Sequence, residues 1–279
     1  MKSKIPAKDK KRTITETFTS QNIPQTENLL TEPEYGEAIA PYFDELFPPK
    51  IMDNVHKPFY NMLVKKYAIQ SACDISCRTG QTLKLLSTLG VKKLAGMDIN
   101  AEMIGAGKKK LPKVEFATAP LNEASQAVSG KFDLVLCSKD SLPLVLDDES
   151  LLNIFVQTKD LLNDTGILIV EVLNYAKIWK NKERFMPVMD RSDGKSSKFF
   201  FYLNDFHEEL LVRNLIRFAH NKHEWFAKIF SIPIRPLMQA ELEFFVKEAH
   251  FSKYGFFGSY TGRPYSAEES PYTILIAKK

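Results

Sequence analysis

Two acids and a glycine, spread over residues 72–100, are the side chains of this chain best suited to hold a cofactor. Asp74 follows a short apolar run, Gly80 ends the polar turn after it, and Asp98 ends a second apolar run that starts at Val91. Leucines at helical spacing fill the segment between the turn and the second run. The stretch therefore predicts a βαβ unit with an acid at the tip of its second strand. An acid in that place can accept hydrogen bonds from the two ribose hydroxyls of an adenosine cofactor.

The composition of the turn separates two kinds of adenosine cofactor. A dinucleotide needs several glycines there, because its pyrophosphate must approach the backbone amides at the start of the helix. The turn from Ser76 to Gly80 contains a single glycine, which argues against a dinucleotide-dependent oxidoreductase. S-adenosylmethionine carries no phosphate and does not make this demand.

The turn resembles the first motif of the class I S-adenosylmethionine-dependent methyltransferases, D-x-G-x-G-x-G. Residues 74–80 read DISCRTG, with Ser76 and Arg78 in place of the first two glycines. Pro120 stands where the family usually carries the acid that holds the adenine amino group. These three departures leave two alternatives open. Either the cofactor site works, or it is weakened or lost and the fold serves as a catalytically inactive binding or regulatory protein.

The side chain of Arg78 decides between these alternatives. If the backbone conformation of the family is kept, a residue other than glycine costs on the order of 1 kcal/mol there. The guanidinium must extend into solvent, pair with Asp74 or Asp98, or enter the space of the cofactor. In the last case the site is closed to S-adenosylmethionine.

Other segments resemble the same family. Residues 35–44 resemble its opening helix, and residues 131–145 resemble its fourth motif, with DSLP where NSLP is frequent in one bacterial branch. The pair Asn174-Tyr175 and the segment 269–271 resemble the bacterial small-molecule N-methyltransferases of the glycine and sarcosine type.

The resemblance implies S-adenosylmethionine as methyl donor and a small molecule, methylated on nitrogen or oxygen, as acceptor. The cofactor-binding residues that it implies are Asp74, Ser76, Arg78, Gly80, Asp98, Ile99, Met103, Leu121 and Ser138. The candidates for contact with the substrate are Tyr42, Asp140, Asn174 and Tyr175, and four arginines could meet an acidic substrate: Arg184, Arg213, Arg217 and Arg235. Methyl transfer from a sulfonium is an in-line displacement on an activated carbon, so it needs neither a catalytic triad nor a metal. We assign no catalytic residue and no metal site.

The elements around these motifs predict an α/β fold. We expect a Rossmann-like sheet of seven strands, with helices on both faces and an antiparallel last strand at 271–279. Three apolar runs between residues 197 and 235 predict antiparallel strands, which we interpret as an inserted β lid at 176–236. After Asn174-Tyr175 no further helix is expected before residue 239. Residues 31–279 form the methyltransferase-like domain, and residues 1–30 are interpreted as a disordered basic arm.

The composition agrees with a cytoplasmic protein that acts on a small molecule. The chain has 279 residues and a formal net charge of +4, but residues 1–12 contain six basic side chains and one acid, so the remainder is nearly neutral. A neutral body argues against a nucleic-acid substrate. The three cysteines fit reduced thiols, and the apolar runs are too short to span a bilayer, which predicts no membrane partner. The oligomeric state and the identity of the substrate cannot be read from the sequence.

Overall fold

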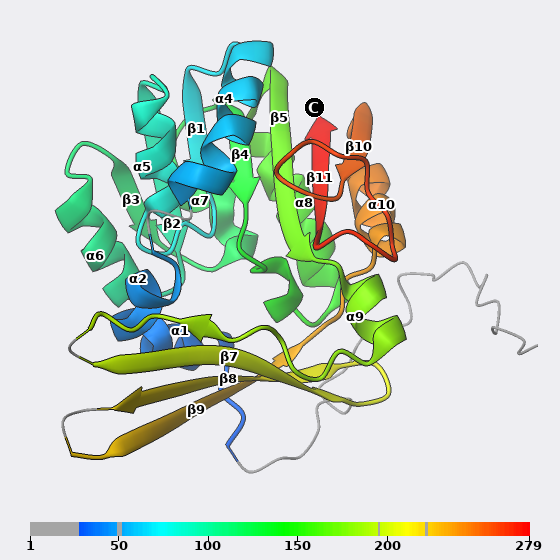
Figure 1. The fold of residues 1–279 in the computed structure, drawn as a ribbon. Coiled ribbons are helices and arrows are strands. Elements are labelled where there is room, and N and C mark those ends of the chain that lie inside the picture. The colour runs from blue at the N-terminus through cyan, green and yellow to red at the C-terminus, as the bar shows by residue number, and fades with distance from the viewer. Residues whose placement is uncertain (1–27, 49–51, 195, 221–222) are drawn as a thin grey trace, which may run out of the picture.

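A seven-stranded sheet forms the centre of the molecule (Figure 1). The computed structural model describes residues 28–48, 52–194, 196–220 and 223–279, so most of the predicted arm at 1–30 lies outside the described residues. The strand order is β10-β11-β5-β4-β1-β2-β3, and β11 alone runs antiparallel to its neighbours. The strands are β1 (Ser71–Asp74), β2 (Lys93–Asp98), β3 (Glu115–Thr118), β4 (Phe132–Cys137), β5 (Leu162–Leu173), β10 (Lys253–Phe257) and β11 (Tyr272–Lys278). The predicted fold class is confirmed.

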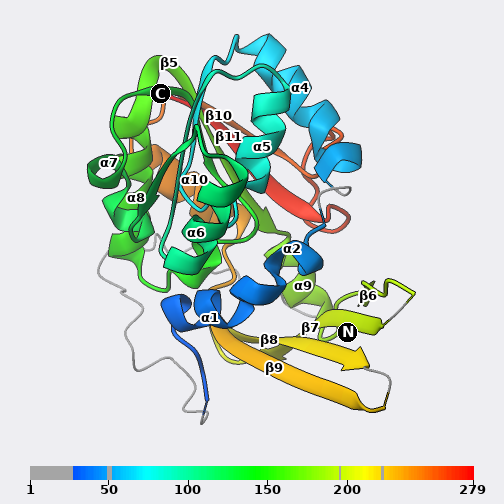
Figure 2. The same ribbon diagram turned by 90° about the vertical axis from the view of Figure 1, so that its left-hand side faces the viewer.

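Helices cover both faces of this sheet (Figure 2). On one face, α4 (Lys57–Lys66) and α5 (Gln81–Thr88) pack apolar side chains against the strands. On the other face lie α7 (Ala124–Ala127), α8 (Asp148–Leu161) and α10 (Gln239–Glu248), and α6 (Ala101–Lys110) follows β2. The remaining helices are α1 (Glu32–Ile39), α2 (Phe43–Leu46) and α9 (Tyr175–Asn181), with a π turn at Met52–His56 and short 3-10 turns at Ala40–Tyr42, Leu121–Glu123 and Leu142–Leu144.

A second, antiparallel sheet lies across the carboxyl ends of the large sheet (Figures 1 and 2). It contains β6 (Met189–Asp190), β7 (Ser197–Phe206), β8 (Leu211–His220) and β9 (Trp225–Ile234), in that order. We call this sheet the lid. The three apolar runs predicted as antiparallel strands are β7, β8 and β9, which pair over ten residues each. Their many aromatic and β-branched residues are typical of strands.

Several polar contacts tie the lid to the amino-terminal helices, and three of them involve Leu30 and Glu45. The backbone N–H of Leu30 donates to the carbonyl of Ser231 on β9, at 2.8 Å. Glu45 of α2 forms ion pairs with two lid residues, with Lys198 at 2.7 Å and with Arg217 at 3.6 Å. Helices α1 and α2 and the lid are therefore joined to each other as well as to the large sheet.

Local sequence signals explain where several helices begin. The Glu34 carboxylate accepts the backbone N–H of Thr31 at 2.8 Å, which completes a capping box before α1. Asn100 caps α6 by accepting the N–H of Met103, and Asp147 caps α8 by accepting the N–H of Ser150.

One expectation about the elements is wrong. We expected no helix after Asn174-Tyr175, but residues 175–181 form α9. This helix has only seven residues and buries just Tyr175 and Ile178, which are too few to show a helical period. Strand β5 begins at Leu162, which pairs with Phe132 of β4, and a register shift then pairs Leu134 with Ile167.

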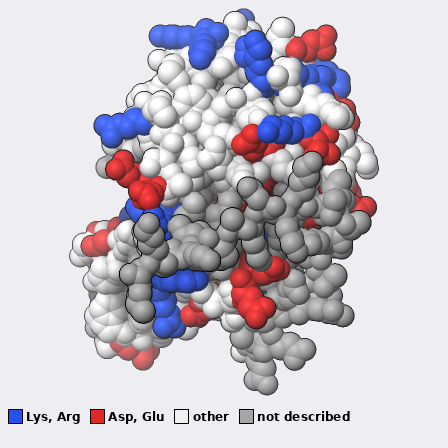
Figure 3. Space-filling model, turned by 90° about the vertical axis from the view of Figure 1, so that its right-hand side faces the viewer, with Lys and Arg blue, Asp and Glu red and all other residues white. Residues whose placement is uncertain are grey.

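The described part of one face of the molecule shows no single sign of charge. On the face drawn in Figure 3, basic and acidic side chains are interspersed among uncharged ones wherever described residues form the surface. Within the described ranges, no helix is both long and apolar enough to cross a bilayer.

Candidate active site

The turn after β1 brings together the acids predicted to hold a cofactor. Strands β1 and β2 are parallel neighbours, so Asp74 and Asp98 lie at the same edge of the sheet. Gly80 ends the turn with φ +78°, and a Cβ on it would lie 3.1 Å from Leu111 and 3.3 Å from Phe116. Both the backbone angle and the close packing favour glycine here.

Asp98 accepts two backbone hydrogen bonds that shape the site. Its Oδ2 atom accepts the N–H of Arg78 and its Oδ1 atom accepts the N–H of Asn100, each at 3.0 Å. The carboxylate is 3 % exposed. It therefore joins the β1 turn to the end of β2 and lies where an acid can meet the hydroxyls of a ribose.

Arg78 points its guanidinium into the space beside Asp98. Its backbone is left-handed, with φ +54°, and the residue is only 6 % exposed. Nη2 donates to the Ser141 hydroxyl at 3.0 Å, and Nε lies 3.9 Å from the Asp98 carboxylate. Of the destinations considered from the sequence, the structure shows the pairing with Asp98, and Arg78 also lines the small cavity beside that acid.

Little space is left beside Asp98. The small cavity there has a volume of about 10 Å³, and its lining is Glu32, Ile75, Ser76, Arg78, Asp98, Ile99, Leu121 and Ser141. That volume holds about one water molecule. The turn and Asp98 suit an adenosine cofactor, but S-adenosylmethionine does not fit while the Arg78 guanidinium lies between Asp98 and Ser141.

A much larger cavity lies on the other side of Arg78. It has a volume of about 260 Å³ and is enclosed by the carboxyl ends of β4 and β5, helices α1 and α2, and the lid. Apolar side chains form much of its wall: Tyr35, Ile39, Phe43, Leu46, Leu144, Ile232 and Ile234. Arg78 is the residue that the two linings share.

One ion pair joins the lid to the loop after β4. The Asp140 carboxylate accepts the Arg213 guanidinium at 2.5 Å, the Tyr175 hydroxyl at 2.7 Å and the backbone N–H of Leu173 at 3.0 Å. Arg213 comes from β8, so this pair holds the lid over the cavity. Nη2 of Arg213 is buried without a hydrogen-bond partner.

Lys139 is a cation inside the site. Its backbone is left-handed, with φ +59°, and its ammonium donates to the Gln81 side-chain carbonyl at 3.1 Å and lies 5.4 Å from the centre of the Phe43 ring. Burial lowers the pKa of Lys139, and the charges of Asp74 and Glu171 oppose this shift.

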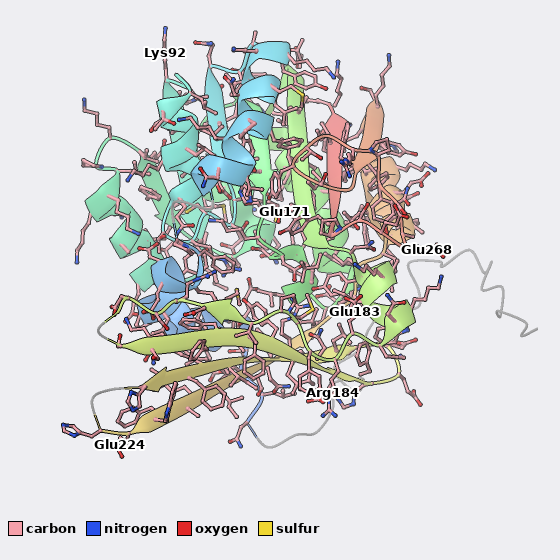
Figure 4. All side chains as sticks on the ribbon, viewed as in Figure 1. Lys92, Glu171, Glu183, Arg184, Glu224 and Glu268 are labelled. Atoms are coloured by element: carbon pink, nitrogen blue, oxygen red, sulfur yellow. The ribbon has the colours of Figure 1, made fainter. Side chains whose placement is uncertain are left out.

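Burial also perturbs three other ionisable groups at the site. It raises the pKa of Glu171 to about 7, while a hydrogen bond from the Tyr260 hydroxyl acts in the opposite direction. It raises the pKa of Asp74 to about 6. It lowers the pKa of His56, which stacks on Tyr260 at 3.8 Å between ring centres, to about 4. Glu171 borders the large cavity, and Figure 4 shows it on β5, toward the strand end that faces the lid.

The structure brings some of the predicted site residues together and leaves others apart. Ser76, Arg78, Asp98, Ile99 and Leu121 line the small cavity, and Asp140 lines the large one. Asp74 accepts the N–H of Ser76 at 3.1 Å, and the Ser138 carbonyl accepts the Ser76 hydroxyl at 3.3 Å, so both acceptors brace the turn.

Seven predicted site residues lie outside both linings: Asp74, Gly80 and Ser138, which belong to the turn or brace it, and four residues further away. Met103 is fully buried in the core, and Tyr42 accepts a hydrogen bond from Lys228. Asn174 caps α9 and donates to the carbonyls of residues 266, 267 and 270. The Tyr175 hydroxyl donates to Asp140, and Tyr175 itself is fully buried. In this structure Asn174 and Tyr175 support the site rather than face the cavity.

Four charged residues of the cavity were missed or not singled out by sequence reasoning: Lys139, Glu171, Arg191 and Arg213. Lys139 lies between two residues that were named, and Glu171 is the one acid in the apolar part of β5, which is a signal that could have been used. Arg213 was one of four arginines considered. The other three are paired outside this cavity lining: Arg184 with Asp205, Arg217 with Glu45, and Arg235 with Asp148 and Glu241.

Comparisons with known proteins agree with this arrangement. Residues 72–166 match a family described as a methyltransferase domain. This range runs from β1 into β5 and includes the turn, Asp98 and the loop after β4. Among curated proteins, no sequence matches the chain.

Solved structures show the class of fold. A S-adenosylmethionine-dependent methyltransferase from Clostridium acetobutylicum superposes with a TM-score of 0.69 at 17% identity, covering 87% of this chain and 98% of that one. CalS10, an amino pentose methyltransferase from Micromonospora echinaspora whose structure has S-adenosylmethionine bound, has a TM-score of 0.66 at 14% identity, covering 91% and 99%. The sugar N-methyltransferase KedS8 from a Streptoalloteichus species has a TM-score of 0.66 at 12% identity, covering 91% and 95%. The fold is that of the class I S-adenosylmethionine-dependent methyltransferases.

Proposed function

We propose that the chain is an S-adenosylmethionine-dependent methyltransferase that acts on a small molecule, on nitrogen or oxygen. The observation that carries the proposal is that Arg78, which pairs with Asp98, lines both the small cavity beside that acid and a cavity of about 260 Å³. The match to a methyltransferase domain over residues 72–166 supports it.

The chain's own residues have separate parts in this proposal. Asp98 would meet the ribose, while Ile99 and Leu121 would flank the adenine, and the bound cofactor would supply an activated methyl group. The large cavity would hold the acceptor and exclude water. Glu171 borders that cavity with a pKa of about 7, so near neutral pH its carboxylate can accept the proton of an amine or hydroxyl acceptor.

Arg78 must leave its present position before the cofactor can bind. Its hydrogen bond to Ser141 and its proximity to Asp98 would be given up. The Asp98 carboxylate would keep its two backbone hydrogen bonds, because these come from main-chain amides.

Calorimetric titration with S-adenosylhomocysteine tests the proposal. One-to-one binding is expected, and ligand at 100 times its dissociation constant should stabilise the fold by about 2.7 kcal/mol, which raises the melting temperature by several degrees. Transfer of labelled methyl groups to a panel of small amines and alcohols is the second readout. Absence of both heat and thermal shift at millimolar ligand would reject the proposal.

A second candidate function is favoured by the buried Arg78–Asp98 pair. In this alternative the guanidinium permanently replaces the cofactor, and the protein binds a small molecule in the large cavity without methylating it. A wild-type protein that ignores S-adenosylhomocysteine but binds it after Arg78→Gly would support this alternative.

A further inference from the structure

We infer that the large cavity is a binding site for a carboxylate group, which Arg78, Lys139 and Arg213 hold together. The inference deepens the proposed function by naming the chemistry of the ligand, but it depends only on the cavity and not on methyl transfer. A carboxylate there could be the amino-acid end of the proposed cofactor or part of the acceptor. Both sources offer the same group to the same three cations.

Arg78 has N–H donors that lack a hydrogen-bond acceptor. A guanidinium carries five N–H donors, yet the Arg78 side chain makes one hydrogen bond, to Ser141, among the described residues. Its Nε is buried and has no hydrogen-bond partner. Buried donors without acceptors are costly, so an anion in the adjoining cavity would satisfy this side chain.

Lys139 is the second cation without a close anionic partner. Its ammonium contacts an amide oxygen and an aromatic ring, and the structure gives it no ion pair among the described residues. Burial penalises its charge. A carboxylate within contact distance would offset that penalty.

Arg213 is the third cation, and two of its three guanidinium nitrogens already have hydrogen-bond partners. Nη1 pairs with Asp140 and Nε donates to the Asn204 side chain at 3.2 Å, whereas Nη2 is buried and unpaired. A guanidinium can hold two oxygen ligands on different edges. Its free Nη2 therefore adds a donor from the lid side of the cavity.

The charges that line the cavity favour an anion as a whole. Four cationic side chains line it, the fourth being Arg191, against two acids, Asp140 and Glu171. Asp140 is engaged by Arg213, and Glu171 has a pKa of about 7, so it is only partly ionised near neutral pH. The remaining wall is largely apolar, which suits one carboxylate on an apolar body better than a polyanion.

The test is calorimetric titration of the full chain with matched probe pairs. Phenylacetate and phenylacetamide have nearly the same shape but differ in charge. S-adenosylhomocysteine and methylthioadenosine share the adenosine and the sulfur, but methylthioadenosine lacks the amino-acid carboxylate. The inference predicts that a carboxylate probe binds at least tenfold more tightly than its neutral counterpart.

Two variants and two controls locate the site. Arg78→Gly and Lys139→Gln should each weaken phenylacetate at least tenfold, and Arg78→Gly should lower the preference for S-adenosylhomocysteine over methylthioadenosine at least tenfold. Exposed residues outside the cavity provide matched controls: Arg263→Gly and Lys108→Gln should change neither value. Thermal melts confirm that each variant is folded, and the comparison of probe pairs on the wild-type protein needs no variant.

The outcomes separate the sources and the two proposals. Binding of phenylacetate without any binding of the adenosine probes would keep the carboxylate site and reject the proposed cofactor. Preference for S-adenosylhomocysteine alone would assign the site to the amino-acid end of the cofactor. Equal affinity within both probe pairs, no binding of either carboxylate probe, or affinities unchanged by Arg78→Gly and Lys139→Gln would overturn the inference.

Discussion

Replacing Arg78 with glycine should open the adenosine side of the site. The guanidinium fills the space between Asp98 and Ser141, where a cavity of only about 10 Å³ remains. Glycine removes the guanidinium and keeps the backbone N–H that Asp98 accepts. It also relieves the left-handed backbone at φ +54°, worth about 1 kcal/mol.

The size of the effect follows from the contacts that a ligand must displace in the wild-type protein. A hydrogen bond involving a charged group contributes about 1.5–3 kcal/mol, and Arg78 makes one, to Ser141. Since 1.36 kcal/mol corresponds to a factor of ten, removing this cost should tighten adenosine binding by about 10- to 100-fold. The same loss, partly offset by the relaxed backbone, should lower the free energy of unfolding by about 1–2 kcal/mol.

Methylthioadenosine is the suitable probe, because it has no carboxylate that could gain from Arg78. Its dissociation constant would be measured calorimetrically for the wild-type protein, Arg78→Gly and the exposed control Arg263→Gly. A dissociation constant that is the same in all three proteins would show that the guanidinium does not stand in the way of adenosine. Weaker binding to Arg78→Gly would refute the reasoning outright.

Three further changes test other parts of the structure. Gly80→Ala should destabilise the fold by about 2–4 kcal/mol, whereas Gly194→Ala should cost about 1 kcal/mol. Both glycines have φ +78°, but only Gly80 has close neighbours around the added Cβ. Chemical denaturation measures both losses, and equal losses would contradict the packing argument. Glu171 has a pKa raised from 4.5 to about 7, so the folded state binds more protons than the unfolded state between these values, and this group lowers stability as pH rises through that window. Glu171→Gln should therefore gain up to about 3 kcal/mol relative to wild type at pH 8 but little at pH 4.5, and a gain independent of pH would disprove the assignment. Asn174→Ala should cost about 2–4 kcal/mol of stability, because it removes the hydrogen bonds that the side-chain amide donates to residues 266, 267 and 270 and accepts from Lys177 and Tyr265. The affinity for phenylacetate should stay the same, and lost affinity in a folded variant would restore Asn174 to the substrate side.

The parts of the fold that depend on neighbouring residues could be predicted from the sequence. The βαβ unit, the need for glycine at residue 80 and the caps at Thr31 and Asn100 are all set by residues within a few positions of one another. Helix α9 was missed because two buried side chains do not make a period.

The path of the Arg78 side chain could not be predicted in the same way. Its partner Ser141 is 63 residues further along the chain, and only the pairing of β1 with β4 brings the two together. Likewise, Lys139 and Glu171 are single charges beside apolar runs, and the lid decides whether they meet solvent or a cavity. Asn174 was read as a substrate residue because an asparagine at a strand end can cap a helix or face a ligand, and the sequence does not distinguish these roles.

The contacts between the lid and the amino-terminal helices determine how the cavity can open. Lifting the lid away from α1 and α2 would break both ion pairs of Glu45 and the hydrogen bond between Leu30 and Ser231 together. Moving the lid and these helices as one shell leaves all three contacts intact. Such a motion separates the shell from the carboxyl ends of the large sheet, so it would break the Arg213–Asp140 pair and the hydrogen bonds from Thr79 and Gln81 to Asp44 of α2. An anion that draws Arg213 away from Asp140 would weaken the ion pair between the lid and the loop after β4. Binding and release of this ligand would therefore both depend on the Arg213–Asp140 pair.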